Sequence, residues 1–142
     1  MREKELILLL GPIGAGKTTL AKQLENGSAI RISQDEMGKK NYLGNFHQAI
    51  SDGVPRIIVD RMNFNYEQRK RFIGPARENG YAVTIIELQT PREVCLERVV
   101  ARQDHPTVEA DNPELANKIL DFYYKEYEKP LTEEYDNYNI DL

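Results

Sequence analysis

Residues 6–24 read LILLLGPIGAGKTTLAKQL, and they contain the pattern GxxxxGK[ST], formed by Gly11, Gly16, Lys17 and Thr18. An unbroken apolar run precedes the pattern, as expected for a strand that is buried on both faces of a parallel sheet. The residues that follow it favour a helix. A buried strand, a glycine-rich loop and a helix in this order predict a loop whose backbone N–H groups surround the phosphates of a nucleoside triphosphate.

Each residue type in this loop has a physical reason. Gly14 and Gly16 can adopt backbone angles that other residues avoid, which lets successive N–H groups turn inward. The positive end of the following helix then points at the phosphates. Lys17 is expected to reach the β- and γ-phosphates, and the Thr18 hydroxyl is expected to bind Mg²⁺. The nucleotide-binding residues predicted from the loop are Gly11, Gly14, Ala15, Gly16, Lys17, Thr18 and Thr19.

The composition limits what else the chain contains. With 142 residues and a net charge of −4, we expect a single domain over 1–142 whose surface as a whole does not bind polyanions. Cys95 is the only cysteine, which excludes an internal disulfide and fits a reducing cytoplasm. The longest apolar run, Leu6–Leu10, is far shorter than the roughly 20 residues of a membrane span. We therefore expect a soluble, cytoplasmic protein without a leader or membrane anchor.

Strands and helices alternate along the rest of the sequence. We expect strands at 4–10, 29–33, 56–60 and 81–88, and helices at 17–25, 42–51, 66–79, 91–102 and 113–129. Gly74 and Pro75 should kink or split the third of these helices. The pattern predicts an α/β fold, a three-layer sandwich around a parallel sheet of at least four strands. For the acidic tail at about 130–142, packing as an edge segment and fraying in solvent both remain open.

Polar residues follow two of these strands, at the edge where such sheets bind ligands. Asp35, after the second strand, is either a carboxylate that activates an acceptor hydroxyl or a helix N-cap. Asp60, at the end of the third strand, either holds Mg²⁺ through water or begins a turn. Asn63 is either a turn residue or a polar contact with the substrate. The spacing alone leaves these alternatives open.

A run of cations follows Asn63. Arg69, Lys70 and Arg71 occupy one turn of the predicted helix, directly after a loop at the ligand-binding edge. A charge run of this kind is usually a solvated helix face. In an acidic protein, however, its position indicates that one or two of these side chains reach a substrate phosphate.

A second pair of cations predicts a lid. Arg98 and Arg102 are four residues apart, so they lie on one helix face, where a bound anion would offset their mutual repulsion. They lead into the polar stretch 103–112, as expected of a helical lid over about 98–113 that covers the phosphates and excludes water. The alternative is a pair of solvated arginines.

Four segments taken in order, GPIGAGKT, SQDEMG, VDRMNFNYEQR and VCLERVVAR, resemble the motifs of the 5′-hydroxyl polynucleotide kinase family. The resemblance extends from Gly11 to about Arg102. That family includes phage polynucleotide kinases, the kinase domains of bacterial RNA-repair enzymes and the kinase domain of fungal tRNA ligases. Many unrelated proteins share the first motif, whereas the combination is much more specific. The second and third motifs look closer to the tRNA-ligase type, some members of which use GTP.

The resemblance implies roles by position. Asp35 matches the general base for the 5′-OH, and Arg69 matches the arginine that contacts the acceptor's phosphate. Arg98 and Arg102 match the lid arginines, which contact the nucleotide and stabilise the transferring phosphoryl group. The implied site therefore contains Lys17, Asp35 and Arg102 as catalytic residues, Asp35, Asn63 and Arg69 for the substrate, and Thr18 with Asp60 for Mg²⁺.

These observations together predict an enzyme that transfers the γ-phosphate of ATP or GTP to the 5′-OH end of RNA or DNA, in nucleic-acid end repair. The chain contains neither ligase nor phosphatase sequence, so those repair activities would belong to separate partner proteins. One alternative is a kinase of a small acceptor, such as a sugar, a nucleoside, an antibiotic or the nucleotide sugar of a zeta-toxin-like enzyme. Another is a nucleotide-dependent binding module without catalysis.

Overall fold

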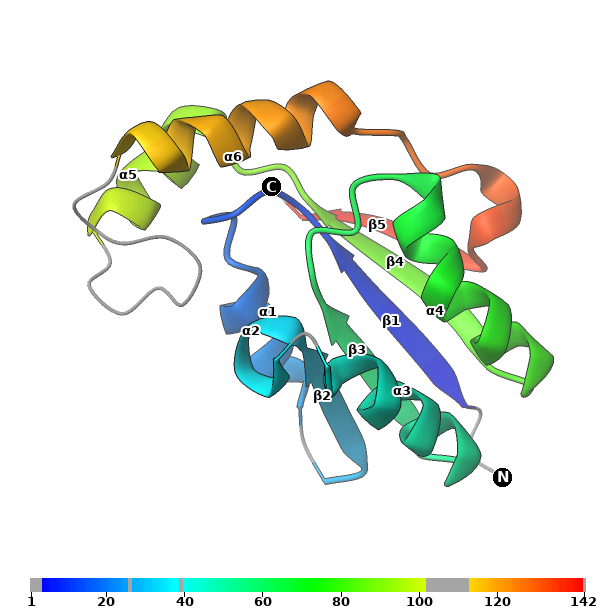
Figure 1. Cartoon of the computed structure of the whole chain (residues 1–142). Helices are drawn as coiled ribbons and strands as arrows, with labels where there is room; N and C mark the ends of the chain where they lie inside the picture. The colour runs from blue at the N-terminus through cyan, green and yellow to red at the C-terminus, as the bar shows by residue number, and fades with distance from the viewer. Residues whose placement is uncertain (1–3, 26, 39, 102–112, 142) are drawn as a thin grey trace.

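The sheet contains five parallel strands, which are β1 (Glu5–Leu10), β2 (Ala29–Ser33), β3 (Arg56–Asp60), β4 (Ala82–Leu88) and β5 (Asn137–Asp141). Their order is β2-β3-β1-β4-β5, so the strand that precedes the glycine-rich loop lies at the centre (Figure 1). The structure is a computed structural model that describes residues 4–25, 27–38, 40–101 and 113–141, without the side chains of residues 35 and 36. The predicted α/β fold with a parallel sheet is confirmed.

Helices cover both faces of the sheet, because the side chains of β1 alternate between two apolar clusters. Leu6, Leu8 and Leu10 pack on one face, and Ile7 and Leu9 pack on the other. The described helices are α1 (Lys17–Leu24), α2 (Gln34–Met37), α3 (Tyr42–Ser51), α4 (Tyr66–Glu78), α5 (Arg92–Ala101) and α6 (Pro113–Glu126). The first face is covered by α3 and α4 and the second by α1, which gives the predicted three layers (Figure 1).

Of the helices in the described part of the chain, none has both the length and the apolar character needed to cross a membrane.

Of the kink or split that the sequence predicted at Gly74 and Pro75 of α4, the split does not occur. Helix α4 is one element from Tyr66 to Glu78 with Pro75 inside it. Phe72 and Ala76, on either side of the proline, are both fully buried, so packing on the sheet outweighs the hydrogen bond that the proline cannot donate.

The C-terminal tail packs as an edge segment. After a single 3-10 turn at Thr132–Glu134, β5 pairs in parallel with β4, and Asn139 lies opposite Ile86. The connection is fixed by Asp136, whose Oδ2 accepts a hydrogen bond of 2.7 Å from the Val83 backbone N–H. Of the two alternatives that the sequence left open for the tail, the structure has the first.

Candidate nucleotide and acceptor site

The glycine-rich loop lies directly against α5. Gly14 has φ +80° and Gly16 has φ +103°, both in the left-handed region that favours glycine. A Cβ at Gly14 would lie 2.5 Å from the Cys95 carbonyl oxygen and 2.9 Å from Val99 Cγ2. The predicted requirement for glycine at these two positions is confirmed, and at Gly14 it comes from close packing as well as from backbone angles.

Contacts at both ends hold this loop in place. The Gly11 N–H donates to the Met62 carbonyl (3.1 Å), and the Thr90 hydroxyl donates to the Ala15 carbonyl (2.9 Å). The Asn63 side chain adds a third contact, because its Nδ2 donates to the Leu9 carbonyl at 2.8 Å. The loop is therefore fixed by β1, by the segment after β3 and by the segment before α5, which prepares it for a ligand.

The end of the loop opens α1 at Lys17. Gly16 is the N-cap of α1, and no side chain in the described part of the chain caps this end. An anion can bind at the first N–H groups of a helix that begins in this way. The Lys17 ammonium is largely buried and donates to the Pro12 carbonyl at 2.7 Å. The Lys17 side chain therefore folds back over the glycine-rich loop.

A hydroxyl and a carboxylate lie side by side below the loop. Thr18 Oγ1 donates to Asp60 Oδ2 at 3.0 Å, and Asp60 is buried at the carboxyl end of β3. These are hard oxygen donors of the kind Mg²⁺ prefers. Within the described residues no group of three or more His, Cys, Asp or Glu forms a metal cage.

Arg31 is a neighbour of this pair that the sequence reasoning missed. Its Nη1 lies 3.2 Å from Asp60 Oδ2, and its Nε lies 3.8 Å from the Glu25 carboxylate. Arg31 is buried in β2, and its guanidinium reaches Asp60 from the strand next to β3. A charged residue between two isoleucines of a predicted strand was the signal that could have identified it.

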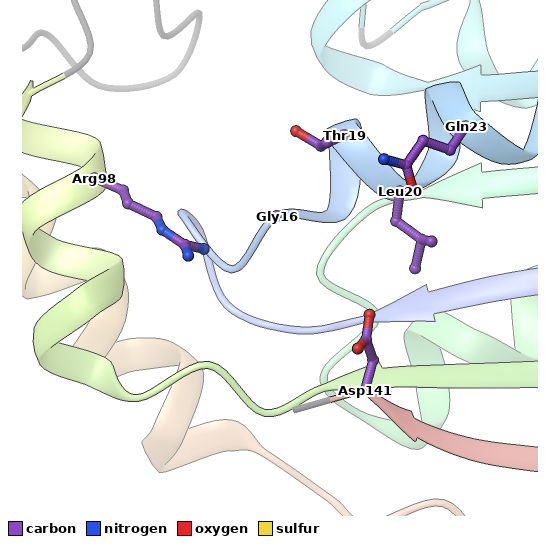
Figure 2. A pocket seen from close by; sticks show the side chains of 6 residues that line it. All are labelled: Gly16, Thr19, Leu20, Gln23, Arg98 and Asp141. Carbon is purple, nitrogen blue, oxygen red and sulfur yellow. The ribbon is translucent and has the colours of Figure 1, made fainter.

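Arg98 and a pocket lie beside the glycine-rich loop. Arg98 Nη1 lies 3.4 Å from the Gly14 carbonyl and 3.5 Å from the Ala15 carbonyl, so α5 delivers this cation to the phosphate loop. The pocket beside it has a volume of about 320 Å³ (Figure 2). Its lining residues are Gly16, Thr19, Leu20, Gln23, Arg98 and Asp141. Arg102 and the rest of the predicted lid, through residue 112, lie outside the described residues.

Two acids that the sequence analysis assigned to the site lie where β2 and β3 end. Ser33 and Asp60 are partners in the sheet register, and α2 starts with the next residue, Gln34. Asp35 is therefore inside a short helix and is not its N-cap, and its backbone follows Ser33 by two residues at the edge that carries Asp60. The Asp35 side chain lies outside the described residues.

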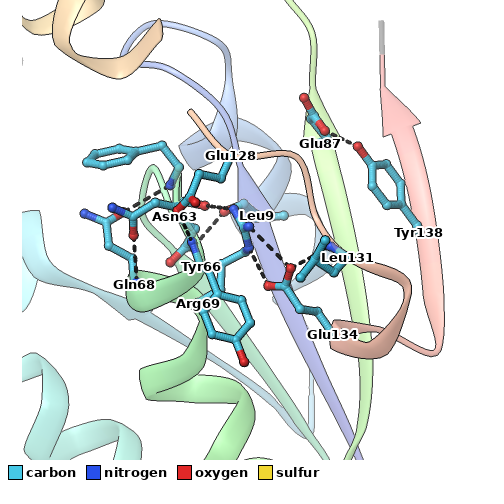
Figure 3. A network of polar contacts seen from close by, with 12 residues as sticks. Leu9, Asn63, Tyr66, Gln68, Arg69, Glu87, Glu128, Leu131, Glu134 and Tyr138 are labelled. Atoms are coloured by element: carbon cyan, nitrogen blue, oxygen red, sulfur yellow. Dashed lines mark hydrogen bonds and ion pairs between the residues drawn. The ribbon is translucent and has the colours of Figure 1, made fainter. Parts of the chain in front are cut away.

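Arg69 is not where the sequence reasoning expected it. The side chain is fully buried, its Nε lies 2.7 Å from Glu134 Oε1, and its Nη1 donates to the Asn63 carbonyl at 2.9 Å (Figure 3). This arrangement leaves no guanidinium surface for an acceptor phosphate, so we correct that expectation. Asn63 is also fully buried, with φ +50°, and its amide supports the phosphate loop.

Arg61 is a cation at this edge that the sequence reasoning did not single out. It directly follows Asp60 and is partly exposed. Its Nη1 donates to the Tyr42 hydroxyl at 3.1 Å, and its Cζ lies 4.8 Å from the centre of the Tyr42 ring. Tyr42 begins α3, so this contact holds the Arg61 side chain against the start of that helix. Its place just after a strand-end acid was the available signal.

Solved structures share this architecture. Kti12 of Chaetomium thermophilum, solved in complex with ADP-AlF3, matches with a TM-score of 0.67 and 19% identity, over 95% of this chain and 87% of its own. A candidate kinase of Chloroflexus aurantiacus matches with a TM-score of 0.68 and 16% identity, over 96% and 86%. At these identities the likeness concerns the fold.

A third match is a chain of the Pnkp1/Rnl/Hen1 RNA repair complex. Its TM-score is 0.63 at 16% identity, and the match covers 92% of this chain but 49% of that one. This chain thus corresponds to about half of that protein. A family model described as an AAA domain matches residues 40–118, which is more than half of the sequence. The chain belongs to this AAA domain family, and it shares its fold with the solved structures described above.

Proposed function

We propose that this chain is a phosphotransferase that moves the γ-phosphate of ATP or GTP to the 5′-OH end of RNA or DNA. The observation that carries the proposal is the pairing of Ser33 with Asp60. Because β2 and β3 end side by side, this pairing brings the Asp35 backbone to the edge where Asp60 meets Thr18. A potential base and a potential metal site therefore flank the phosphate loop on its acceptor side.

The proposed reaction divides between donor and acceptor residues. The loop amides, Lys17, Arg98 and Arg102 neutralise the phosphates and the charge that develops on the transferring group. Thr18 and Asp60 would hold Mg²⁺, which supplies further neutralisation of the phosphate oxygens. The acceptor oxygen attacks the γ-phosphorus in line, its proton passes to the Asp35 carboxylate, and the bond to the β-phosphate oxygen breaks to release the diphosphate.

The acceptor contacts differ from those that the sequence resemblance implied. Arg61 takes the role of the cation that meets the acceptor's phosphate, since Arg69 is buried against Glu134. Asn63 supports this role indirectly, because its side-chain amide donates to the Arg61 carbonyl at 3.3 Å as well as to Leu9. A likeness to a chain of an RNA repair complex supports a polynucleotide acceptor. The proposal also includes separate ligase or phosphatase partners and a cytoplasmic location.

The direct test is transfer of a labelled γ-phosphate from ATP or GTP to a 5′-OH oligonucleotide. We expect transfer by the wild type and a loss of at least 100-fold for Asp35→Asn, the scale of general base catalysis, with nucleotide affinity unchanged. The matched control is Asp52→Asn, an exposed acid in the same β2–β3 connection, which should keep full activity.

Three outcomes would count against the proposal. Full activity of Asp35→Asn would remove Asp35 from the role of base. Efficient competition by a small metabolite, with phosphate transferred to it instead of the oligonucleotide, would identify a small-molecule kinase. Tight nucleotide binding with transfer to no acceptor would identify a binding module.

A further inference from the structure

The pocket beside the phosphate loop contains a carboxylate that phosphate chemistry does not need. Asp141 ends β5, two strands away from β1, and it is exposed. Its backbone carbonyl accepts a hydrogen bond of 2.9 Å from the Gln89 N–H, which anchors the strand end. The pocket's volume of about 320 Å³ is at the lower end of the range typical of small-molecule sites.

The two charged side chains of this pocket lie at its opposite ends. Arg98 reaches the carbonyls of the phosphate loop, so it marks the phosphate end. Leu20 and Gln23 lie three residues apart on α1, beyond that loop, and the Leu20 side chain points toward Asp141 (Figure 2). The hollow therefore runs from a cationic end at the phosphates to an anionic end at Asp141.

The negative charge at the Asp141 end of the pocket suits the nucleoside part of a nucleotide and not its phosphates. A carboxylate next to a triphosphate would be repelled, so the partner of Asp141 must be on the nucleoside. An ionised carboxylate accepts hydrogen bonds and donates none. Guanine offers two adjacent donors, N1–H and the N2 amino group, whereas the corresponding edge of adenine pairs one amino donor with the acceptor N1. A carboxylate matches both guanine groups and is repelled by the adenine nitrogen.

We propose that this pocket is a guanine site, with Asp141 as the residue that selects GTP as the phosphate donor. The Leu20 side chain supplies an apolar surface for the base, and the Gln23 amide supplies a group that can donate to the guanine O6. The inference rests on the proposed function, because it names the donor of that transfer, yet it is tested by nucleotide binding alone.

The experiment compares GDP, ADP and XDP by calorimetry on the full chain with Mg²⁺. We expect the wild type to bind GDP at least about tenfold more tightly than ADP, the scale of one lost hydrogen bond to a charged group. Asp141→Asn should lose this preference and favour XDP over GDP. The Asn oxygen still accepts from N1–H, and its NH₂ can donate to the C2 carbonyl that xanthine has in place of the guanine amino group.

Glu133→Gln is the matched control, because it neutralises an exposed acid of the same C-terminal segment that does not line the pocket. It should keep the wild-type order of affinities. Equal affinity of the wild type for GDP and ADP would overturn the inference, and so would an Asp141→Asn variant that keeps the guanine preference. A guanine preference without transfer to a 5′-OH end would overturn the proposed function and leave the guanine site standing.

Discussion

The Arg69 guanidinium and the Glu134 carboxylate form a buried ion pair that joins α4 to the C-terminal segment. Nε and Oε1 are 2.7 Å apart, and the two side chains are 0% and 3% exposed. Glu134 Oε2 also accepts from the Leu131 backbone N–H at 2.6 Å. The pair therefore connects residues 65 positions apart in the sequence and orders the turn that leads into β5.

Removing one partner of this pair should destabilise the fold. Arg69→Ala leaves the Glu134 carboxylate buried without its cation, so we expect the free energy of unfolding to fall by about 3–5 kcal/mol. Urea denaturation followed by circular dichroism measures the change. The matched control is Arg71→Ala on the same helix, whose side chain is exposed and whose effect should stay within about 0.5 kcal/mol. An Arg69→Ala variant of wild-type stability that binds oligonucleotides weakly would return Arg69 to the acceptor site.

The contact between Thr18 and Asp60 predicts a metal-dependent step in nucleotide binding. Thr18→Val removes the hydroxyl and keeps the shape of the side chain. We expect the gain in nucleotide affinity on adding Mg²⁺ to shrink by about tenfold, since one of the hard oxygen ligands is lost. Affinities measured by calorimetry in Mg²⁺ and in EDTA give this ratio. An equal loss of affinity in both buffers would instead indicate damage to the loop.

Glycine substitutions should have opposite effects at two positions. Gly14→Ala places a Cβ 2.5 Å from the Cys95 carbonyl at φ +80°, so the loop must move and nucleotide binding should be lost. Gly44→Ala lies on the exposed face of α3 with open space around it, and it should stabilise the protein by about 0.5–1 kcal/mol. Thermal melting and nucleotide titration of both variants test this. Retained nucleotide affinity in Gly14→Ala would show that the loop tolerates a shift from α5.

The pairing of two tyrosines with Glu87 predicts a dependence of stability on alkaline pH. Tyr127 and Tyr138 both donate to the buried Glu87 carboxylate. Burial, followed by the hydrogen bond to Glu87, raises the pKa of Tyr138 above its ordinary value of 10.0. Because the folded state keeps the proton that the unfolded chain loses, this contribution is fully present below pH 10 and is lost as the pH rises further.

We therefore expect Tyr138→Phe to lower the free energy of unfolding by about 1.5–3 kcal/mol at pH 8. The difference from the wild type should shrink above pH 10, by at most about 1.4 kcal/mol per pH unit. Urea denaturation at pH 8, 10 and 11 measures it. A difference that stays constant across this range would mean that the Tyr138 hydroxyl titrates normally in the folded protein.

Substitution of Arg61 should weaken binding of the acceptor oligonucleotide and leave binding of the donor nucleotide unchanged. Arg61→Gln removes the charge but keeps a polar side chain, and we expect the KM for a 5′-OH oligonucleotide to rise about tenfold through loss of a charge-assisted contact to phosphate. The nucleotide affinity should stay within about twofold. Steady-state kinetics at varied oligonucleotide concentration, with Arg71→Gln as the exposed control, separate the two. An unchanged KM would exclude Arg61 from the acceptor site.

The fold could be predicted best in those segments whose local sequence pattern favours the same structure that the whole fold requires. β1, its loop and α1 were predictable because an apolar run, a glycine motif and a helix-forming stretch agree with one another. β5 was not, since its residues, NYNID, are polar and mostly exposed, and only pairing with β4 makes them a strand. The continuity of α4 through Pro75 likewise depends on the sheet beneath it.

The sequence identified which residues lie near the candidate site, but it did not identify the partners that each side chain contacts. Arg69, Lys70 and Arg71 read as one charge run, although Arg69 shares a helical face with Phe72, Ile73 and Ala76 at the spacing of buried positions. That spacing indicated burial. Its partner Glu134, however, is far away in the sequence, and no local pattern identifies it. Arg61 was not predicted, because the motif assigns roles to its neighbours Asp60 and Asn63 and none to Arg61.

The pocket that Asp141 closes joins the first quarter of the chain to its final strand. During synthesis β1, the phosphate loop and α1 are made before β5, because chains are made from the N-terminus onward, and the carboxylate that we assign to base selection lies on β5. A nascent chain that has β1 and α1 but lacks β5 would bind the phosphates of a nucleotide, but it would bind ATP and GTP equally well. Discrimination between donors would then be acquired only when β5 pairs with β4.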